Sequence, residues 1–211
     1  MVDRLPAAIM GTVMCSTQHA ASPSRLLPAP PLSRLAAVAV DGATYLIIPA
    51  LLIPVGLLLG RRGVTLNYLA VNGIGLAFVI APATAWAAWS EARPRGATAG
   101  KRLLRLQVID RRTGGLPSGR QALVRNLVKI TVPWELGHTV ALGYANLEGG
   151  EVPVWLWVLT AITYGWVLAN LVLLLMRSGK PAHDRLAHTV VTRAQFLRTA
   201  PRGGSQCTAD R

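Results

Sequence analysis

The sequence predicts an all-α integral membrane protein: a bundle of four transmembrane helices with a cytoplasmic amphipathic helix and a short extended or hairpin segment. Three observations predict this fold class. Of the 211 residues, 52% are hydrophobic and only 15% are charged, whereas ordinary soluble domains carry about 25% charged residues. Apolar stretches with at most one charge reach the length of about 20 residues that a helix needs to cross a bilayer. The 22 Lys and Arg residues gather in some connecting segments and are nearly absent from others.

The first two predicted spans are residues 36–59 and 64–89. The first contains a single charge, Asp41, and is followed by two arginines. The second contains no charge, and two tryptophans lie near its far end, where aromatic side chains favour the membrane–water interface. Both segments are longer than the strands of a buried parallel sheet, which excludes a soluble α/β fold.

The other two predicted spans are residues 130–147 and 152–176. The former is short and contains Pro133, Glu135 and His138, and one carboxylate near the centre of a span costs about 2.5–3.5 kcal/mol. The charge distribution decides in its favour. Before, between and after the four spans the chain carries 3, 2, 10, 0 and 7 Lys or Arg residues. Four spans place 20 of the 22 on one side, which the positive-inside rule identifies as the cytoplasm, with both termini there.

Residues 93–129 are predicted to form an interfacial cytoplasmic loop. Residues 104–108 alternate in polarity, and a turn cluster follows at 111–115, which indicates an extended segment or a hairpin. The series SGRQ at 118–121 has the form of a capping box, so a helix is expected to start at Gly119. Its leucines share one face and its basic residues lie largely off that face, which is typical of an amphipathic helix on the inner leaflet.

Residues 96–102, GATAGKR, differ from a phosphate-binding loop. Only three residues separate the two glycines, and Arg102 stands where such a loop carries Ser or Thr. The segment is therefore interpreted as a flexible turn ahead of the interfacial segment, and its Lys101 is a secondary candidate site residue.

Residues 1–32 and 194–211 are expected to be disordered cytoplasmic tails on either side of a membrane domain at 33–193. An apolar stretch near the start resembles a signal peptide, but it is broken by proline and glycine and leads into a Ser/Pro-rich sequence, so a tail is favoured over a cleaved signal. Cys15 and Cys207 lie in opposite tails, which predicts neither a disulfide nor a metal site.

The formal net charge of +13 is interpreted as attraction to membranes. Basic residues beside spans attract anionic lipids of the cytoplasmic leaflet, at about 1 kcal/mol each. The expected partners are therefore the bilayer and these lipids, with a second copy of the chain as a further candidate. Nucleic acid is not expected, because the aromatic residues lie in or beside the spans instead of on a soluble basic module. No enzyme motif is found, so neither catalysis nor a cofactor is expected.

Asp41 is the foremost candidate site residue, because an ionisable side chain inside a span is costly and usually faces a partner, a cavity or a pathway. Arg34 precedes it by seven residues, so the two share a helix face about 10 Å apart along the axis. Asp41 could be an ion or proton site, or a polar tie that fixes helix packing. Contact with Arg34 requires the arginine to reach down, and a neighbouring helix could supply the partner instead.

Four further residues are secondary candidates. Glu135 and His138 are three residues apart and so neighbours on one helix face. They could form a proton relay or half of a metal site, but two ligands do not make a metal site, and a wetted pair near a span end is favoured. His183 lies in the C-terminal segment, where solvated histidines are common, and Arg185 follows it.

Three stretches of the sequence occur together in a known family of membrane proteins. The first, SRLAAVAVD at 33–41, has an Arg at the mouth of the first span and an Asp within it. The second is residues 96–110, which contain Gly-Lys, followed by LVRNL at 123–127. The third, HDRLAHTVV at 183–191, is close to the tail pattern H-D-R-L-A-x-T-x-V. Together they resemble the RDD family of bacterial multi-pass membrane proteins.

The resemblance implies a name-giving trio of Arg34, Asp41 and Asp184, and a location in the bacterial inner membrane. The chain departs from the family pattern at Ala99, where Pro is common, and at His188, where Gly is usual. Transport has been proposed for the family, with cation/proton exchange attributed to some members, so a role in transport is implied without a mechanism.

Two functions therefore remain open. In the first, the protein transports an ion or small solute with Asp41 as its intramembrane site, and four short spans would require an oligomer to form a pathway. In the second, it is a non-transporting structural or accessory subunit in which the trio only holds the helices together. Because Asp184 directly follows the last span, it could join Arg34 at the cytoplasmic side and clamp the ends of the first and last spans.

Overall fold

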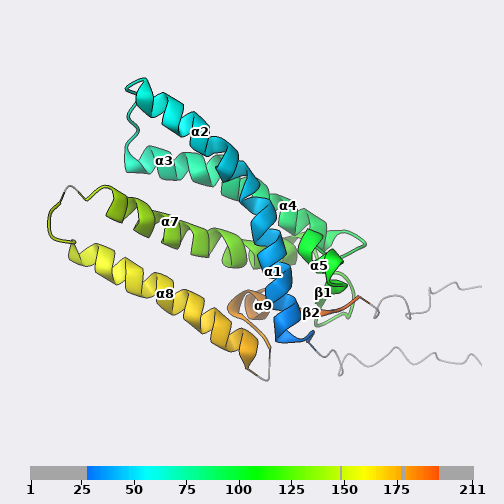
Figure 1. Cartoon of the computed structure of the whole chain (residues 1–211). Coiled ribbons are helices and arrows are strands. Elements are labelled where there is room, and N and C mark those ends of the chain that lie inside the picture. Colours follow the sequence, from blue (N-terminus) through cyan, green and yellow to red (C-terminus); the bar gives the residue numbers. More distant parts are fainter. Residues whose placement is uncertain (1–27, 148, 177–178, 195–211) are drawn as a thin grey trace, which may run out of the picture.

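A computed structural model describes residues 28–147, 149–176 and 179–194, and these residues are mostly helical (Figure 1). Three continuous helices are long and apolar enough to cross a membrane: Pro31–Arg61, Tyr68–Ala92 and Val154–Leu175. They confirm the predicted helical membrane architecture and correspond to three of the four predicted spans. Most of the two predicted tails, including Cys15 and Cys207, lies outside the described residues.

The first long helix consists of α1 (Pro31–Tyr45) and α2 (Ile47–Arg61). A single turn residue, Leu46, separates the two parts. Pro49 explains this interruption, because a proline has no N–H to donate to the carbonyl four residues earlier, here that of Tyr45.

The second long helix consists of α3 (Tyr68–Gly75), the π-helical turn η2 (Leu76–Ile80) and α4 (Ala81–Ala92). It begins later than the predicted residue 64, because Asn67 caps it: the Asn67 side chain accepts a hydrogen bond of 2.8 Å from the Ala70 N–H. It also extends past the predicted end and so includes Glu91.

A further helical stretch lies between the second and the last of these three helices. It contains α6 (Gly119–Asn126), the π-helical turn η3 (Leu127–Thr131) and α7 (Val132–Ala145). The predicted capping box is confirmed: the Gln121 N–H donates to Ser118 Oγ over 3.2 Å, and the Ser118 N–H donates to Gln121 Oε1 over 2.9 Å. The apolar and basic residues lie on different faces, as predicted: Leu123 and Leu127 are exposed, whereas Arg125 is buried. Carboxylates on neighbouring elements hold Arg125 inward, and Arg120 is exposed.

Both π-helical turns stand directly before a helix whose second residue is proline. Pro82 and Pro133 cannot donate to the carbonyls of the preceding turn. The backbone accommodates the missing donors with wider turns, in which the Ala81 N–H reaches Leu76 O and the Val132 N–H reaches Leu127 O. Thr84, in the first turn of α4, and Thr131, in η3, share a hydrogen bond of 3.0 Å, so the regions beside the two prolines lie next to each other.

The last long helix, α8 (Val154–Leu175), packs against α7. Gly143 permits this close approach, because a Cβ atom there would lie only 2.8 Å from the side chain of Leu156. Leu156 is fully buried at this contact.

The remaining elements form a small cap: α5 (Ala99–Leu103), β1 (Leu106–Asp110), α9 (Ala182–Leu186) and β2 (Thr189–Arg193). The predicted extended segment forms, but its partner is not a local hairpin strand. Instead β1 pairs antiparallel with β2, with Leu106 opposite Arg193. Leu106, Val108 and Val191 form a core with Ala29 and Ala37 of the first helix region.

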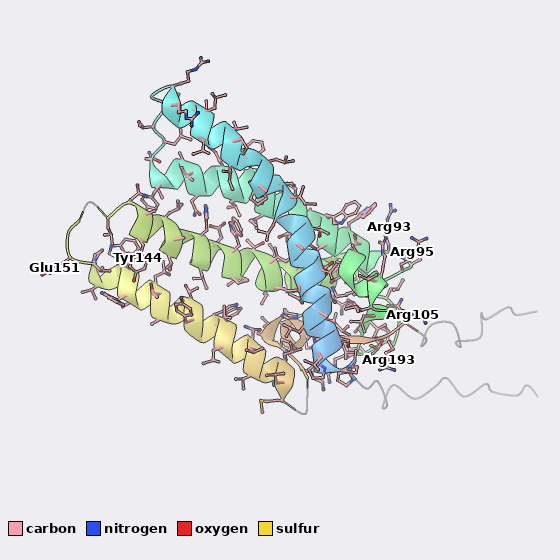
Figure 2. The ribbon with its side chains drawn as sticks, in the orientation of Figure 1. Arg93, Arg95, Arg105, Tyr144, Glu151 and Arg193 are labelled. Atoms are coloured by element: carbon pink, nitrogen blue, oxygen red, sulfur yellow. The ribbon has the colours of Figure 1, made fainter. Side chains whose placement is uncertain are left out.

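The helices form two hairpins, α2–α3 and α7–α8, whose connected ends lie at one end of the molecule, with the cap at the other end (Figure 1). Figure 2 shows Arg93, Arg95, Arg105 and Arg193 at the cap end and Tyr144 and Glu151 at the opposite end. Many large apolar side chains of α2, α3 and α8 are exposed, a surface expected to contact lipid rather than water. Among the described residues, the labelled arginines therefore gather at the cap end.

Candidate functional site: a buried ring of charges

Seven side chains at the junction of the cap and the helices form a continuous set of polar contacts, which we call the charge ring. Each is at most 5% exposed, although charged groups are rarely buried unless they are paired. The ring consists of Arg34, Asp41, Glu91, Thr98, Lys101, Arg125 and Asp184.

Asp41 anchors the start of α5 to α1. Its Oδ2 accepts a hydrogen bond of 2.5 Å from Thr98 Oγ1, and its Oδ1 accepts one of 2.8 Å from the Gly100 N–H. Gly100 is required at this point because a Cβ atom there would lie 2.3 Å from the carbonyl oxygen of Ala37. Both oxygens of the candidate carboxylate are thus engaged, and the partner comes from the loop instead of from Arg34.

Lys101 extends the ring from α5 to α4. Its Nζ donates to Glu91 Oε1 and, over 3.3 Å, to Thr98 Oγ1. The other oxygen of Glu91 accepts a hydrogen bond of 2.9 Å from Asn126 Nδ2 on α6. The Gly-Lys pair of the loop therefore has two distinct structural roles, a close backbone approach and a buried ion pair.

Arg125 joins α6 to both α4 and α9. Its Nε lies 3.4 Å from Glu91 Oε2 and its Nη1 lies 3.2 Å from Asp184 Oδ1. Burial alone would lower the pKa of Arg125, but the adjacent carboxylates of Asp184 and Glu91 outweigh burial and raise it. The guanidinium therefore stays charged between two carboxylates.

Arg34 closes the ring. Its Nη2 donates to Asp184 Oδ2, and its Nη1 donates to the carbonyl oxygen of Gly179. The expected contact between Arg34, at the start of the first helix, and Asp184, in the C-terminal segment, is thus present. Because Arg34 and Asp41 both belong to α1, the set of contacts begins and ends on one helix.

Two candidates lie beside the ring. His183 Nε2 is 3.9 Å from Asp184 Oδ1. Burial, followed by the positive charges of Arg125, Lys129 and Arg34, lowers the pKa of His183 well below its usual value. Its imidazole is therefore neutral and mostly buried, in contrast to the solvated histidine expected from the sequence. Arg185 is exposed and donates to the carbonyl oxygen of Lys180.

The other two candidates, Glu135 and His138, lie away from the ring, between α7 and α3. Glu135 Oε2 accepts a hydrogen bond of 3.0 Å from Asn72 Nδ2, and His138 Nδ1 lies 2.6 Å from Asn72 Oδ1. Neither the ring nor this pair resembles a metal centre, since the described part of the chain contains no group of three or more His, Cys, Asp or Glu residues able to hold an ion.

Sequence reasoning missed Glu91 and Arg125, which are the centre of the ring. A signal was present: Glu91 is a single carboxylate directly after a tryptophan-flanked apolar span, followed two residues later by an arginine. An acidic residue at the end of an apolar span, followed by many basic residues, indicates a specific cationic partner.

Comparison with models of known protein families matches residues 28–188 with the model described as the RDD family. The match includes every residue of the charge ring. Searches of curated protein sequences and of solved structures find no significant match.

Proposed function

The chain belongs to the RDD family, and from this premise we propose that it is a four-span protein of the bacterial inner membrane whose motif residues fasten the helices together. In this proposal it is a non-transporting structural or accessory subunit. The observation that carries the proposal is the closure of the charge ring, in which Asp41 has hydrogen-bond donors on both oxygens and Arg34 and Asp184 are paired.

The proposed fourth span is the η3–α7 segment. It contains 19 residues, from Leu127 to Ala145, and at 1.5 Å per residue it is roughly 28 Å long, close to the hydrocarbon thickness of about 30 Å. It runs from the cap end to the same end as the connection at 62–67 (Figure 1). The cationic residues at the cap end support a cytoplasmic location of that end and of both termini.

Cysteine accessibility tests this topology in a chain whose native Cys15 and Cys207 are replaced. A single cysteine at Gly150, between α7 and α8, is expected to react with a membrane-impermeant maleimide added to intact cells. A cysteine at exposed Arg95 is expected to react only after the membrane is permeabilised. The reverse pattern, or labelling of both positions in intact cells, would refute the four-span arrangement.

The structural role of Asp41 is tested by Asp41→Asn in the purified protein. One amide oxygen cannot replace two carboxylate oxygens as acceptors, so we expect a loss of about 1–3 kcal/mol in the free energy of unfolding. The matched substitution Asp110→Asn affects a carboxylate outside the ring, which accepts from the Arg112 N–H, and is expected to be better tolerated. Wild-type proteoliposomes are expected to show no cation or proton flux that depends on Asp41.

Transport of an ion or small solute is the second candidate function, and one observation favours it. The contacts of Asn72 with Glu135 and His138 place ionisable groups between otherwise apolar helices, which is where membrane proteins keep pathway residues. If Glu135→Gln or Asp41→Asn abolishes a flux that the wild type supports, while the thermal unfolding temperature is unchanged, transport is the correct function.

A further inference from the structure

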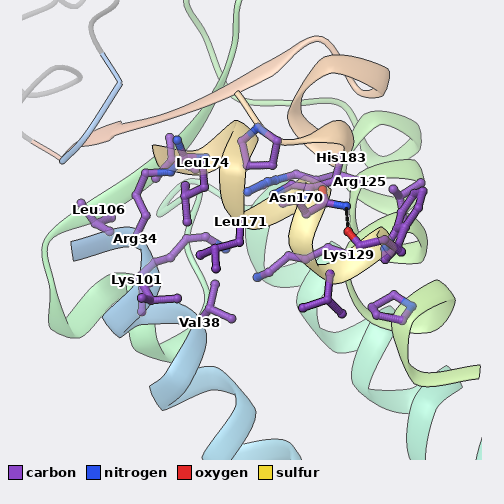
Figure 3. Close-up of a pocket in the computed structure, with 18 residues that line it drawn as sticks. Arg34, Val38, Lys101, Leu106, Arg125, Lys129, Asn170, Leu171, Leu174 and His183 are labelled. Carbon is purple, nitrogen blue, oxygen red and sulfur yellow. Dashed lines mark hydrogen bonds between the residues drawn. The ribbon is translucent and has the colours of Figure 1, made fainter. Parts of the chain in front are cut away.

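A cavity of about 510 Å³ lies beside the charge ring and among α1, α8 and the η3–α7 segment (Figure 3). Its volume lies within the range of about 300–1,000 Å³ that is usual for sites of small molecules. The charged residues that line it are all basic, namely Arg34, Lys101, Arg125 and Lys129, joined by His183. None of the three ring carboxylates is among its lining residues, so every charged side chain that the described part of the chain contributes to the cavity wall is basic.

Lys129 is the residue that most needs a partner. The ring itself is balanced, with three cations (Arg34, Lys101 and Arg125) and three carboxylates (Asp41, Glu91 and Asp184). Lys129 adds a fourth cation. Its Nζ is buried and has no hydrogen-bond partner among the described residues. Because a buried ammonium without a partner is costly, the cavity favours an occupant that brings one negative charge.

The rest of the cavity is apolar. Leu171, Val167 and Leu174 of α8 face Val38 and Leu35 of α1 across it, and Figure 3 shows Leu171 and Val38 between Arg34 on one side and Lys129 on the other. An inorganic anion would leave this apolar surface uncovered. An occupant with a hydrocarbon chain would cover it.

The cavity also opens where a lipid can enter. Val38, Val167 and Leu171 line it and are at the same time exposed on the outer surface of the helices, which is the surface expected to contact lipid. Its basic residues lie at the cap end of these helices, which in the proposed four-span arrangement is the depth of the phosphates of one leaflet. Both the opening and the depth therefore fit a molecule of the bilayer.

We propose that this cavity is a binding site for one anionic phospholipid, with its phosphate group at Lys129 and Arg125 and the upper part of an acyl chain between α1 and α8. The phosphate would accept a charge-assisted hydrogen bond from Lys129 Nζ, and its single charge would balance the fourth cation. The site is distinct from the diffuse attraction of surface Lys and Arg residues to anionic membranes. It does not depend on whether the charge ring has only a structural role.

The test is native mass spectrometry of the full-length protein, titrated with phosphatidylglycerol or with phosphatidylcholine of the same acyl chains. We expect one tightly bound phosphatidylglycerol in the wild type and weaker binding of phosphatidylcholine. Lys129→Gln is expected to weaken phosphatidylglycerol binding by at least about tenfold, since it removes a charge-assisted hydrogen bond. Lys180→Gln is the matched control, because Lys180 lies at the same end but does not line the cavity, and its affinity is expected to equal that of the wild type.

A second variant tests the acyl chain. Val38→Trp fills the apolar part of the cavity and keeps every charge, so it is expected to lose the tightly bound lipid. Excess inorganic phosphate is expected to leave the bound lipid in place. Lys129→Gln should fold normally, with an unfolding temperature at or above that of the wild type without lipid, because it removes an unpaired buried charge.

Four results would overturn the proposal: unchanged phosphatidylglycerol affinity in Lys129→Gln or in Val38→Trp, equal affinity for the two lipids, or displacement of the lipid by inorganic phosphate. The last result would identify a site for a soluble anion instead of a lipid. None of these results bears on Asp41, so failure here is distinguishable from failure of the proposed structural role.

Discussion

Gly100 is the residue at which α5 comes closest to α1, and its lack of a side chain has a measurable consequence. Gly100→Ala is expected to destabilise the protein by about 1–3 kcal/mol, as overpacking does in closely packed interiors, because the new methyl group would lie 2.3 Å from the Ala37 carbonyl oxygen. It would also displace the N–H that binds Asp41.

The measurement is thermal unfolding in detergent, followed by size-exclusion chromatography. Gly137→Ala, within α7, is the matched control, because a Cβ atom there meets nothing within 4 Å. It is expected to be neutral or slightly stabilising, since alanine favours helices over glycine. Equal stability of the two variants would contradict the proposed tight approach.

His183 provides a prediction about pH. Its pKa is lowered in the folded protein by burial and by the neighbouring positive charges, so the unfolded chain takes up a proton near pH 6.5 that the folded protein does not. The free energy of unfolding should therefore fall as the pH drops below about 6.5. His183→Gln is expected to show a shallower fall between pH 7.5 and 5.5 in the same unfolding assay. An unchanged slope would mean that other groups cause the pH dependence.

His188 shows what the sequence could and could not reveal at this scale. It stands where the family pattern usually has glycine, and its φ angle is +53°, in the left-handed region that glycine adopts most easily. The departure was visible in the sequence, whereas the reason for the glycine preference required the turn between α9 and β2.

At the scale of elements, the ion pair of Arg34 and Asp184 fastens α1 to α9. Arg34→Gln or Asp184→Asn alone is expected to cost about 3–5 kcal/mol, because the first leaves buried Asp184 with Arg125 as its one remaining arginine and the second leaves buried Arg34 without its carboxylate. The double variant is expected to cost less than the sum of the two. A double-mutant cycle of unfolding free energies measures this coupling.

The control for the cycle combines Asp184→Asn with Glu151→Gln, because Glu151 is exposed at the opposite end of the molecule (Figure 2). If the costs in unfolding free energy add for Asp184 and Glu151 but not for Arg34 and Asp184, then Arg34 and Asp184 interact directly. Strict additivity in both pairs would show that Arg34 and Asp184 do not stabilise one another.

Elements with local signals were predicted well, and elements that depend on distant partners were not. The capping box fixed the start of α6 because Ser118 and Gln121 contact each other across one turn. The alternating residues of β1 predicted a strand, but its partner lies more than seventy residues further along the chain, so a local hairpin was the nearest available inference. The inward orientation of Arg125 could not be predicted, because it depends on carboxylates from two other elements.

At the scale of the whole molecule, the two ends of the described chain meet in the cap. The Ala29 N–H donates to the carbonyl oxygen of Val191 over 2.8 Å, and the core of the cap contains residues from both ends. The four-span topology predicted that Arg34 and Asp184 would lie together, because it places both segments on one side of the membrane, and the helical membrane architecture followed from hydropathy alone. The fourth span remains a prediction from the distribution of Lys and Arg residues between the spans.

A chain that ends at Met176 tests this dependence on the last segment. It lacks Asp184 and β2, so Arg34 and Arg125 lose a carboxylate and the apolar side chains of β1 lose their cover. We expect little monodisperse protein in detergent extracts. A chain that ends at Ala194 retains every described contact and is expected to behave as the full-length protein does. Comparable yields of the two truncated chains would show that the helices fold independently of the cap.

The attachment of α1 at two points also limits how the molecule can move. Arg34 and Asp41 are held by different parts of the cap, so α1 can neither rotate about its axis nor slide along it without breaking both attachments. The interruption at Leu46 lies just beyond the second attachment. We therefore expect a force on the far end of the first helix, from the bilayer or from another protein, to bend it at Leu46, so that α2 pivots while α1 remains stationary.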